Sequence, residues 1–350
     1  MDREPNLRYK IPQPLKEITE DIASCIYKSE FCLYDSADIA TAIVISAVKN
    51  QSLETVARFP NADTVFWRIG KGITFEKLER LAKTQRPPKG SHIKILIDGH
   101  DVMFHGKDAL GVVGTKPKDG TSKSFKYLAA YSNTQPKGIV ALRELFDGSV
   151  TEDAMKMISD LAKDYVIDLV VMDGEFYKAE LVEYLSKAGI PFVVRRTNTG
   201  NIRELNISYD KPHYYETTVK RKDGTDIDLS YWLYRYNGRD GDFYLASNIK
   251  TTQRKLRRMQ KTRWNIETGF REVNRVKIKT TTRDFLVRLF FYTISCILYN
   301  LWQKIKFRYG LLAMRFDEVI GQVKRFVKES VLQRTDFFGR LRRRYIRLAI

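Results

Sequence analysis

Hydrophobic positions recur at helical spacing through the first quarter of the chain. The period is clear over residues 18–26 and again over 37–47. The segment 52–69 predicts two short helices around a Phe-Pro-Asn break, which is the outline of a helix-turn-helix. An ordinary helical hairpin explains that segment equally well. We therefore predict a helical N-terminal domain over residues 1–84 and treat DNA binding by it as a hypothesis.

Beyond a linker at 85–90 that contains two prolines and a glycine, the pattern changes to apolar strands separated by helices. The predicted elements are, in order, strands at 92–97, 124–132 and 138–145, a helix capped by Ser149, a strand at 168–172, a helix at 178–188 and a strand at 190–194. Uninterrupted apolar strands are typical of sheets covered on both faces. The order predicts an α/β fold in which helices flank a mixed sheet.

Residues 197–249 have a different pattern, in which segments of alternating apolar and polar residues are joined by turns that contain glycine. This pattern predicts an antiparallel, β-rich insertion. Helical periodicity returns at about 254–275 and continues to the end of the chain. We therefore assign the α/β core to residues 91–196 and 250–310, and a basic helical C-terminal segment to 311–350.

The charge is concentrated in the last part of the chain. Of 350 residues, 61 are Lys or Arg and 42 are Asp or Glu, a net charge of +19. Residues 250–350 hold 26 of the basic and 7 of the acidic residues, so they carry the whole excess. Basic side chains gain free energy on a polyanion because they release its condensed counterions. A nucleic acid is the expected partner, and charge alone leaves DNA and RNA both open.

The remaining composition describes a folded protein of a reducing compartment. The chain is 43% hydrophobic and 29% charged, which excludes a disordered or fibrous protein. Cys25, Cys32 and Cys296 lack the spacing of a zinc site. The charged N-terminus has no signal-peptide pattern, and the apolar run 289–302 is shorter than a membrane span. We expect a cytoplasmic protein without a membrane partner.

Three acidic residues stand where chemistry on phosphate could take place. Asp98 directly follows the first predicted strand, Asp173 follows another, and Glu267 lies in a basic helix between Arg263 and Arg271. Each alone is more simply a turn former or an ion-paired surface residue. Together, in a basic chain, they suggest a divalent-ion site, because carboxylate oxygens bind Mg²⁺ or Mn²⁺. Two such ions can drive phosphoryl transfer.

Nearby polar residues offer alternatives to the first acid. Asp101 follows the same strand as Asp98, and we favour Asp98 because it abuts the strand. His100 and His105 are interpreted as polar loop residues and not as metal ligands.

These residues lie in segments that resemble DDE transposases of bacterial and archaeal insertion sequences. The resemblance runs from about 93 to 302 and rests on IDGHDVMFHGK, VVMDGEFYKAELVEYLSKAGIPFVVRR, DFYLASNI and RWNIETGFREVN. It implies a ribonuclease H-like catalytic core with a β-rich insertion between the second Asp and the Glu. It also implies that Asp98, Asp173 and Glu267 bind two Mg²⁺ or Mn²⁺ ions.

The family often has a Tyr-Arg-Glu-Lys signature around the Glu, and this chain matches it in part. Arg263 and Glu267 have the right spacing, whereas Gln260 stands at the Tyr position and Asn274 at the Lys position. Cations just beyond Asn274 can replace the missing Lys. The tryptophans are candidates for stacking on an unpaired base, with burial in the core as the alternative. The residues expected to contact DNA are Arg263, Arg271, Asn274, Arg275, Lys277, Trp232 and Trp264.

The resemblance implies a transposase that cleaves DNA at transposon ends and transfers the strand into target DNA. Its partners would be double-stranded DNA and, on DNA, a second copy of the chain. A metal-dependent nuclease on the same fold and a non-catalytic DNA-binding protein derived from a transposase remain alternative hypotheses.

Overall fold

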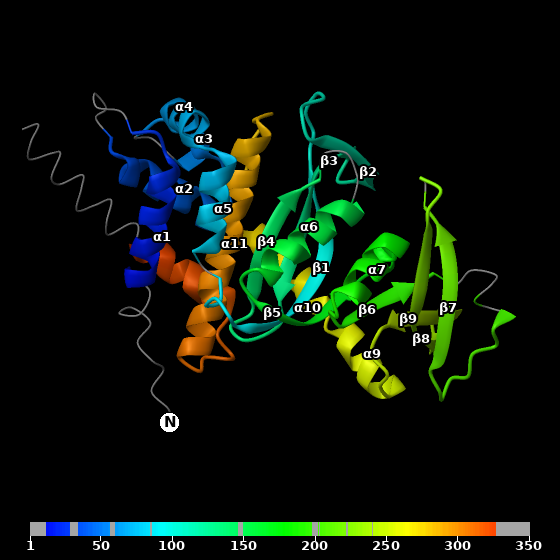
Figure 1. The fold of residues 1–350 in the computed structure, drawn as a ribbon. Helices are drawn as coiled ribbons and strands as arrows, with labels where there is room; N and C mark the ends of the chain where they lie inside the picture. The colour runs from blue at the N-terminus through cyan, green and yellow to red at the C-terminus, as the bar shows by residue number, and fades with distance from the viewer. Residues whose placement is uncertain are drawn as a thin grey trace, which may run out of the picture. The chain divides into compact units, whose positions relative to one another are not determined.

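The computed structural model divides the chain into two compact units, which are described separately below (Figure 1). The helical unit comprises Met1–Thr84 and Glu272–Ile350, and the sheet unit comprises Gln85–Arg271. The structure describes residues 12–28, 34–56, 60–84, 86–145, 150–197, 202, 204–221, 223–239 and 241–326. The cap predicted at Ser149, the thiol of Cys32 and residues 327–350 of the predicted C-terminal segment lie outside these residues.

A mixed sheet is the framework of the sheet unit, with nine strands among the described residues. The strand order is β2-β3-β1-β5-β6-β9-β8-β7, and β4 pairs with β3. Strands β1, β5 and β6 run parallel to one another, whereas the other pairs are antiparallel. The bounds are β1 His92–Met103, β2 Val112–Lys118, β3 Thr121–Ser132, β4 Gly138–Glu144, β5 Val166–Met172, β6 Phe192–Arg196, β7 His213–Lys220, β8 Asp226–Gly238 and β9 Gly241–Ser247. The predicted mixed sheet is confirmed.

Helices lie on both faces of this sheet (Figure 1). Helices α6 (Val150–Ala162) and α7 (Ala179–Lys187) pack on one face, in a core that includes Ile95 and Ile97 of β1. Side chains alternate along a strand, so the neighbours of these isoleucines point to the opposite face. There α10 (Trp264–Val273) lies over β1, while α9 (Gln253–Lys261) contacts β5 and β6. The flanking helices follow the α/β prediction.

The β-rich insertion is continuous with the main sheet. Strand β9 pairs antiparallel with β6, with Val194 opposite Ala246, and β8 and β7 then extend the sheet outward. The predicted turn at Asp223-Gly224 joins β7 to β8, and Gly224 has a φ of +86° that favours glycine. The insertion therefore shares one hydrogen-bonded sheet with the parallel strands.

Three elements differ from the sequence prediction. Strand β1 continues past Ile97 to Met103, because β3 supplies backbone partners along this whole stretch. Strand β2 was not predicted, since it is an exposed edge strand with a proline and little apolar alternation. The single helix predicted at 254–275 is instead α9, α10 and the 3₁₀ turn η3 (Asn274–Val276), with a break at Thr262–Arg263.

The helical unit is built around α11 (Phe285–Arg308), which contacts four of the N-terminal helices. The other helices are α1 Pro12–Cys25, α2 Ser36–Lys49, α3 Leu53–Val56, α4 Ala62–Gly72 and α5 Phe75–Lys83. Helix α11 is long and apolar enough to cross a membrane, but 83% of its most apolar window is buried inside the protein. Helix α11 therefore groups with the N-terminal helices, whereas the sequence pattern assigns residues 250–310 to the α/β core.

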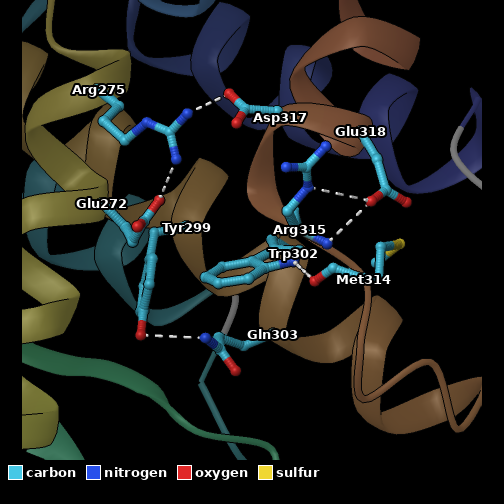
Figure 2. A network of polar contacts seen from close by, with 9 residues as sticks. All are labelled: Glu272, Arg275, Tyr299, Trp302, Gln303, Met314, Arg315, Asp317 and Glu318. Atoms are coloured by element: carbon cyan, nitrogen blue, oxygen red, sulfur yellow. Dashed lines mark hydrogen bonds and ion pairs between the residues drawn. The ribbon is translucent and has the colours of Figure 1, made fainter.

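The end of α11 is fixed to the segment that follows it. Trp302 stacks on Phe316 with ring centroids 5.0 Å apart, and its Nε1 donates to the carbonyl of Met314 at 3.2 Å (Figure 2). Residues 316–326 are helical. The segment predicted as a helix-turn-helix forms α3 and α4, and Asn61 caps α4 by accepting a hydrogen bond from the backbone of Thr64.

A buried arginine ties α4 to the chain between α1 and α2. Arg68 is 1% exposed, and its guanidinium donates to the carbonyls of Tyr27 (2.8 Å) and Tyr34 (2.6 Å) and to the hydroxyl of Ser36 (3.2 Å). Truncating it leaves buried acceptors without donors and a cavity, which together cost several kcal/mol.

We expect Arg68→Ala to lower the free energy of unfolding by about 3 kcal/mol or more, measured by urea denaturation. Arg80→Ala is the matched control, because Arg80 is exposed on α5. Its effect should stay within about 0.5 kcal/mol. Equal midpoints for the two variants would contradict a structural role for Arg68.

Candidate active site

The strand register brings the first two acidic residues together. In the parallel pair of β1 and β5, Ile97 lies opposite Met172, so Asp98 and Asp173 occupy the next position on adjacent strands. Asp98 lies within β1, opposite Ala129 of β3, and so it does not follow the strand as the sequence predicted. Each aspartate accepts a hydrogen bond on Oδ1 from the backbone N–H of the following glycine, at 2.9 Å for Asp98 and 2.7 Å for Asp173. The Oδ2 atoms of both aspartates lie near the same nitrogen, Nη1 of Arg263.

Helix α10 delivers the third carboxylate. Its buried side is anchored by Ile266 and Phe270, and Phe270 stacks on the ring of His100 at 4.5 Å. The amide of Asn265 also donates to the side chain of Asn133 at 2.8 Å. His100 therefore lies in β1 and helps to seat α10, contrary to its interpretation as a loop residue. These contacts position Glu267, one residue beyond Ile266, over the strand that carries Asp98.

One guanidinium group joins the three acids. Arg263 Nη1 lies 3.1 Å from Asp98 Oδ2, 3.7 Å from Asp173 Oδ2 and 2.7 Å from Glu267 Oε1. The side chains of Asp98 and Arg263 are only 14% and 15% exposed, while Asp173 and Glu267 are about one-third exposed. Three carboxylates that lie far apart along the chain thus converge on one cationic nitrogen.

The position of Asp98 perturbs its ionisation. Burial raises the pKa of Asp98 to about 6, and the negative charges of Asp173 and Glu175 act in the same direction. The Arg263 guanidinium and the N–H of Gly99 oppose this shift. Burial has the largest effect on this pKa. The folded protein therefore disfavours the charged carboxylate of Asp98 unless a further positive charge lies nearby.

The donor set of this cluster suits a hard divalent cation. Asp98, Asp173 and Glu267 offer carboxylate oxygens, the ligands that Mg²⁺ and Mn²⁺ prefer. Within the ranges that the structure describes, no three His, Cys, Asp or Glu side chains are already arranged around a common metal position. The three carboxylates are instead drawn onto Arg263. The residues therefore fit a divalent ion by the chemistry of their oxygen donors, while in this arrangement Arg263 supplies the positive charge among them.

Asp101 occupies a different environment. It accepts hydrogen bonds from the hydroxyls of Thr115 (3.1 Å) and Ser124 (3.0 Å). Because it is three residues from Asp98 in the same strand, the alternation of side chains places the two on opposite faces. This geometry favours Asp98 as the first acid of the cluster.

The residues expected to contact DNA lie in several places. Arg271 is exposed on α10, four residues after Glu267, and Trp264 is 63% exposed at the start of that helix. Trp232 lies on β8, half-buried against Tyr214 and beneath the ammonium of Lys250 at 4.7 Å. Trp264, next to Arg263, is therefore the tryptophan placed beside the acidic cluster.

The other predicted DNA contacts belong to the helical unit. Asn274 is exposed and Lys277 is half-buried. Arg275 is an ion-pair partner of Glu272, at 2.8 Å, and of Asp317 (Figure 2). Its charge is thus balanced by two carboxylates, a setting that local sequence patterns do not indicate.

Glu175 is an acidic residue near the site that the sequence analysis missed. It lies in the 3₁₀ turn η2 (Gly174–Phe176), and its Oε1 lies 3.4 Å from where a Cβ on Gly99 would be. Its charge contributes to the raised pKa of Asp98. In the sequence, its position two residues after Asp173, in the motif MDGEF, could have indicated that Glu175 lies near the site.

Comparison with known proteins agrees with this fold. In a search of solved structures, the chain is similar to a piggyBac transposase in a cryo-EM structure of its synaptic complex with hairpin DNA. The TM-score is 0.55 at 13% identity, and the match covers 94% of this chain and 80% of that one. At this identity the likeness concerns the fold alone. A search of curated proteins finds no match.

The comparison with protein families is more specific. The model of the transposase DDE domain matches residues 89–301, which is more than half of the chain. This span includes β1, β5 and α10 and therefore all three acids of the cluster. The chain belongs to the family of transposases that carry a DDE domain.

Proposed function

We propose that this protein is a divalent-metal-dependent transposase that cleaves DNA at the ends of its element and joins them to target DNA. In the first step, water attacks the phosphorus and the bond to the 3′-oxygen breaks. The leaving oxygen takes up a proton to give a 3′-hydroxyl, and the other fragment keeps the 5′-phosphate. In the second step, that 3′-hydroxyl attacks a target phosphodiester and displaces its 3′-oxygen.

The observation that supports this proposal is the convergence of Asp98, Asp173 and Glu267 on one position, at the end of β5 and of the stretch of β1 that pairs with it. Ligand sites of α/β sheets lie at these strand ends. The three carboxylates would hold two Mg²⁺ or Mn²⁺ ions. When bound, such ions activate the attacking oxygen and stabilise the leaving oxygen.

The basic and aromatic residues of α10 would orient the DNA strand. Arg263 directs its Nη1 at the carboxylates and offsets one of their three negative charges, which reduces the repulsion that an approaching phosphate meets. Arg271 and Trp264 are exposed nearby on the same helix and can contact a phosphate and a base. Because two ends must be held together for joining, we expect a homodimer on DNA.

The test is incubation of the purified chain with DNA that carries the element's own termini, a target plasmid and Mg²⁺. We expect cleavage at the termini and covalently joined donor–target product, both lost in EDTA. Cleavage without joined product would favour a nuclease on the same fold. Duplex binding without either product would favour a non-catalytic DNA-binding protein.

A further inference from the structure

Helix α9 carries a cationic face beside the acidic cluster. Residues 243–266 include seven Lys or Arg and no Asp or Glu. Three of these cations recur at helical spacing on α9 and are exposed, and we name them the α9 stripe: Arg254, Arg258 and Lys261. None of the three forms an ion pair with any residue that the structure describes. Their charge is therefore available to an anion from outside the chain.

The buried side of α9 fixes the direction in which the stripe points. Leu256 is fully buried, and α9 contacts β5 and β6. The guanidinium of Arg257 packs over the ring of Phe243 at 4.3 Å, which holds a second side chain of the helix against the sheet. With 3.6 residues per turn, the α9 stripe lies on the side of the helix away from Leu256. The stripe is thus a fixed row of cations on the solvent side of α9.

The stripe leads to the acidic cluster. Lys261 is two residues before Arg263, whose Nη1 is the common partner of the three carboxylates. From Arg254 to Lys261 the stripe extends about 10 Å along the helix axis. Phosphates of one B-DNA strand follow one another every ~3.4 Å along the duplex axis, so the stripe can contact about three of them at most. A duplex bound there would have its backbone beside the site of the proposed reaction.

The helices on the opposite face of the same sheet are electrically balanced. On α6 the ammonium of Lys156 lies 3.9 Å from the carboxylate of Glu152, and on α7 that of Lys187 lies 2.7 Å from Glu183. A positive charge that served solubility alone would not need to stay unpaired on one face of the sheet. The contrast favours a polyanion as the partner of the α9 stripe.

The proposed reaction requires two duplexes at one cluster of carboxylates. The 3′-hydroxyl of the element's end attacks a phosphodiester of the target, so both DNA segments must reach the same three acids. The residues proposed to orient the end, Arg271 and Trp264, lie on α10. The α9 stripe precedes Arg263 and is a separate cationic surface, and it therefore suits the second duplex.

We propose that the α9 stripe binds the phosphate backbone of the target duplex and positions it for joining. The proposal rests on the proposed function for the reaction, and it assigns to α9 a contact that is used in the joining step and not in cleavage of the ends. Contacts to phosphates position DNA without reading its bases. The stripe therefore holds target duplexes of any sequence.

The test separates cleavage from joining. The triple variant Arg254→Gln/Arg258→Gln/Lys261→Gln removes the charge of the stripe and keeps residues that favour a helix. In Mg²⁺ it should cleave DNA that carries the element's termini at the wild-type rate. With pre-cleaved ends and a target plasmid, joined product should fall by about tenfold or more, because charge-assisted contacts to the target are lost. Arg254→Lys/Arg258→Lys keeps the charge and should retain joining.

A binding measurement gives a readout besides activity. In EDTA, the affinity of the protein bound to pre-cleaved ends is titrated with a labelled target duplex at several salt concentrations. For the triple variant, the slope of log affinity against log salt should decrease in magnitude by about 0.9 for each phosphate that is no longer bound. The matched control removes three charges from the opposite face, Lys156→Gln/Lys163→Gln/Lys187→Gln, and should keep the wild-type slope and joining.

The outcomes distinguish this proposal from the proposed function. A folded triple variant, checked by circular dichroism and its urea midpoint, that joins like the wild type would overturn the role of the stripe. Loss of end cleavage along with joining would also overturn it, by placing the stripe on the element's end. A wild-type chain that neither cuts nor joins DNA would reject the proposed function. A weaker salt slope in the triple variant alone would then still support duplex binding by α9.

Discussion

Replacing Glu267 with Gln is expected to slow cleavage at the element's ends by two to three orders of magnitude (about 10²- to 10³-fold) while duplex DNA binding persists. The substitution keeps the shape of the side chain but removes one of three charges that would hold the ions, and it breaks the 2.7 Å ion pair with Arg263. Loss of one such electrostatic element reduces the chemical step by about 10²- to 10³-fold. Single-turnover cleavage of end-labelled DNA in Mg²⁺ measures this effect.

A second readout is independent of turnover. Titration with Mn²⁺, followed by electron paramagnetic resonance, should show weaker ion binding by Glu267→Gln than by the wild type. Asp101→Asn is the matched control, because it also removes one negative charge but lies on the other face of β1. Wild-type cleavage by Glu267→Gln would remove Glu267 from the site, and loss of cleavage in Asp101→Asn alone would make Asp101 the first acid.

Asp98→Asn is expected to stabilise the metal-free protein at neutral pH while abolishing its cleavage. Burial raises the pKa of Asp98 from 3.8 to about 6 in the folded state, so the fold disfavours the charged carboxylate. A carboxyl with a raised folded pKa lowers stability as pH rises from about 4 to about 6 and keeps that penalty above it. The shift corresponds to at most about 3 kcal/mol, and we expect a gain of about 1–3 kcal/mol at pH 7.5.

The measurement is urea unfolding in EDTA at pH 7.5 and at pH 4. The gain should be present at pH 7.5 and vanish near pH 4, where Asp98 is protonated in the folded wild type. Glu180→Gln, an exposed change on α7, should leave the stability unchanged at both values. A variant that is less stable than the wild type at pH 7.5 would show that Asp98 contributes more through Arg263 than its burial costs.

Much of the sheet could be predicted because its strands are apolar and continuous. The cores of β5 and β6 were predicted within a few residues, since both faces of these strands are covered. The extension of β1 through Asp98 to Met103 could not, because the sequence DGHD is typical of a turn. It is held in the strand only by its pairing with β3, a long-range interaction that local patterns do not carry.

The side chains of the candidate site could also be predicted only in part, because some of their contacts depend on long-range interactions. Strand position indicated Asp98 and Asp173, and the register of β1 with β5 makes them neighbours. The role of Arg263 as the common partner of the acids depends on the break between α9 and α10, which no glycine or proline marks. Glu175 was missed because an acidic residue in a turn is ordinarily solvated, and only the fold places its charge near Asp98.

The antiparallel pairing of β9 with β6 has a consequence for how small the catalytic unit can be. If the insertion were deleted, β6 would become an outer strand whose backbone N–H and C=O groups face solvent unpaired. Such an edge is a template for association with other chains. Strands β9, β8 and β7 move this edge from the apolar β6 to the exposed and more polar β7, so we expect a shortened protein to stay soluble only if it keeps them.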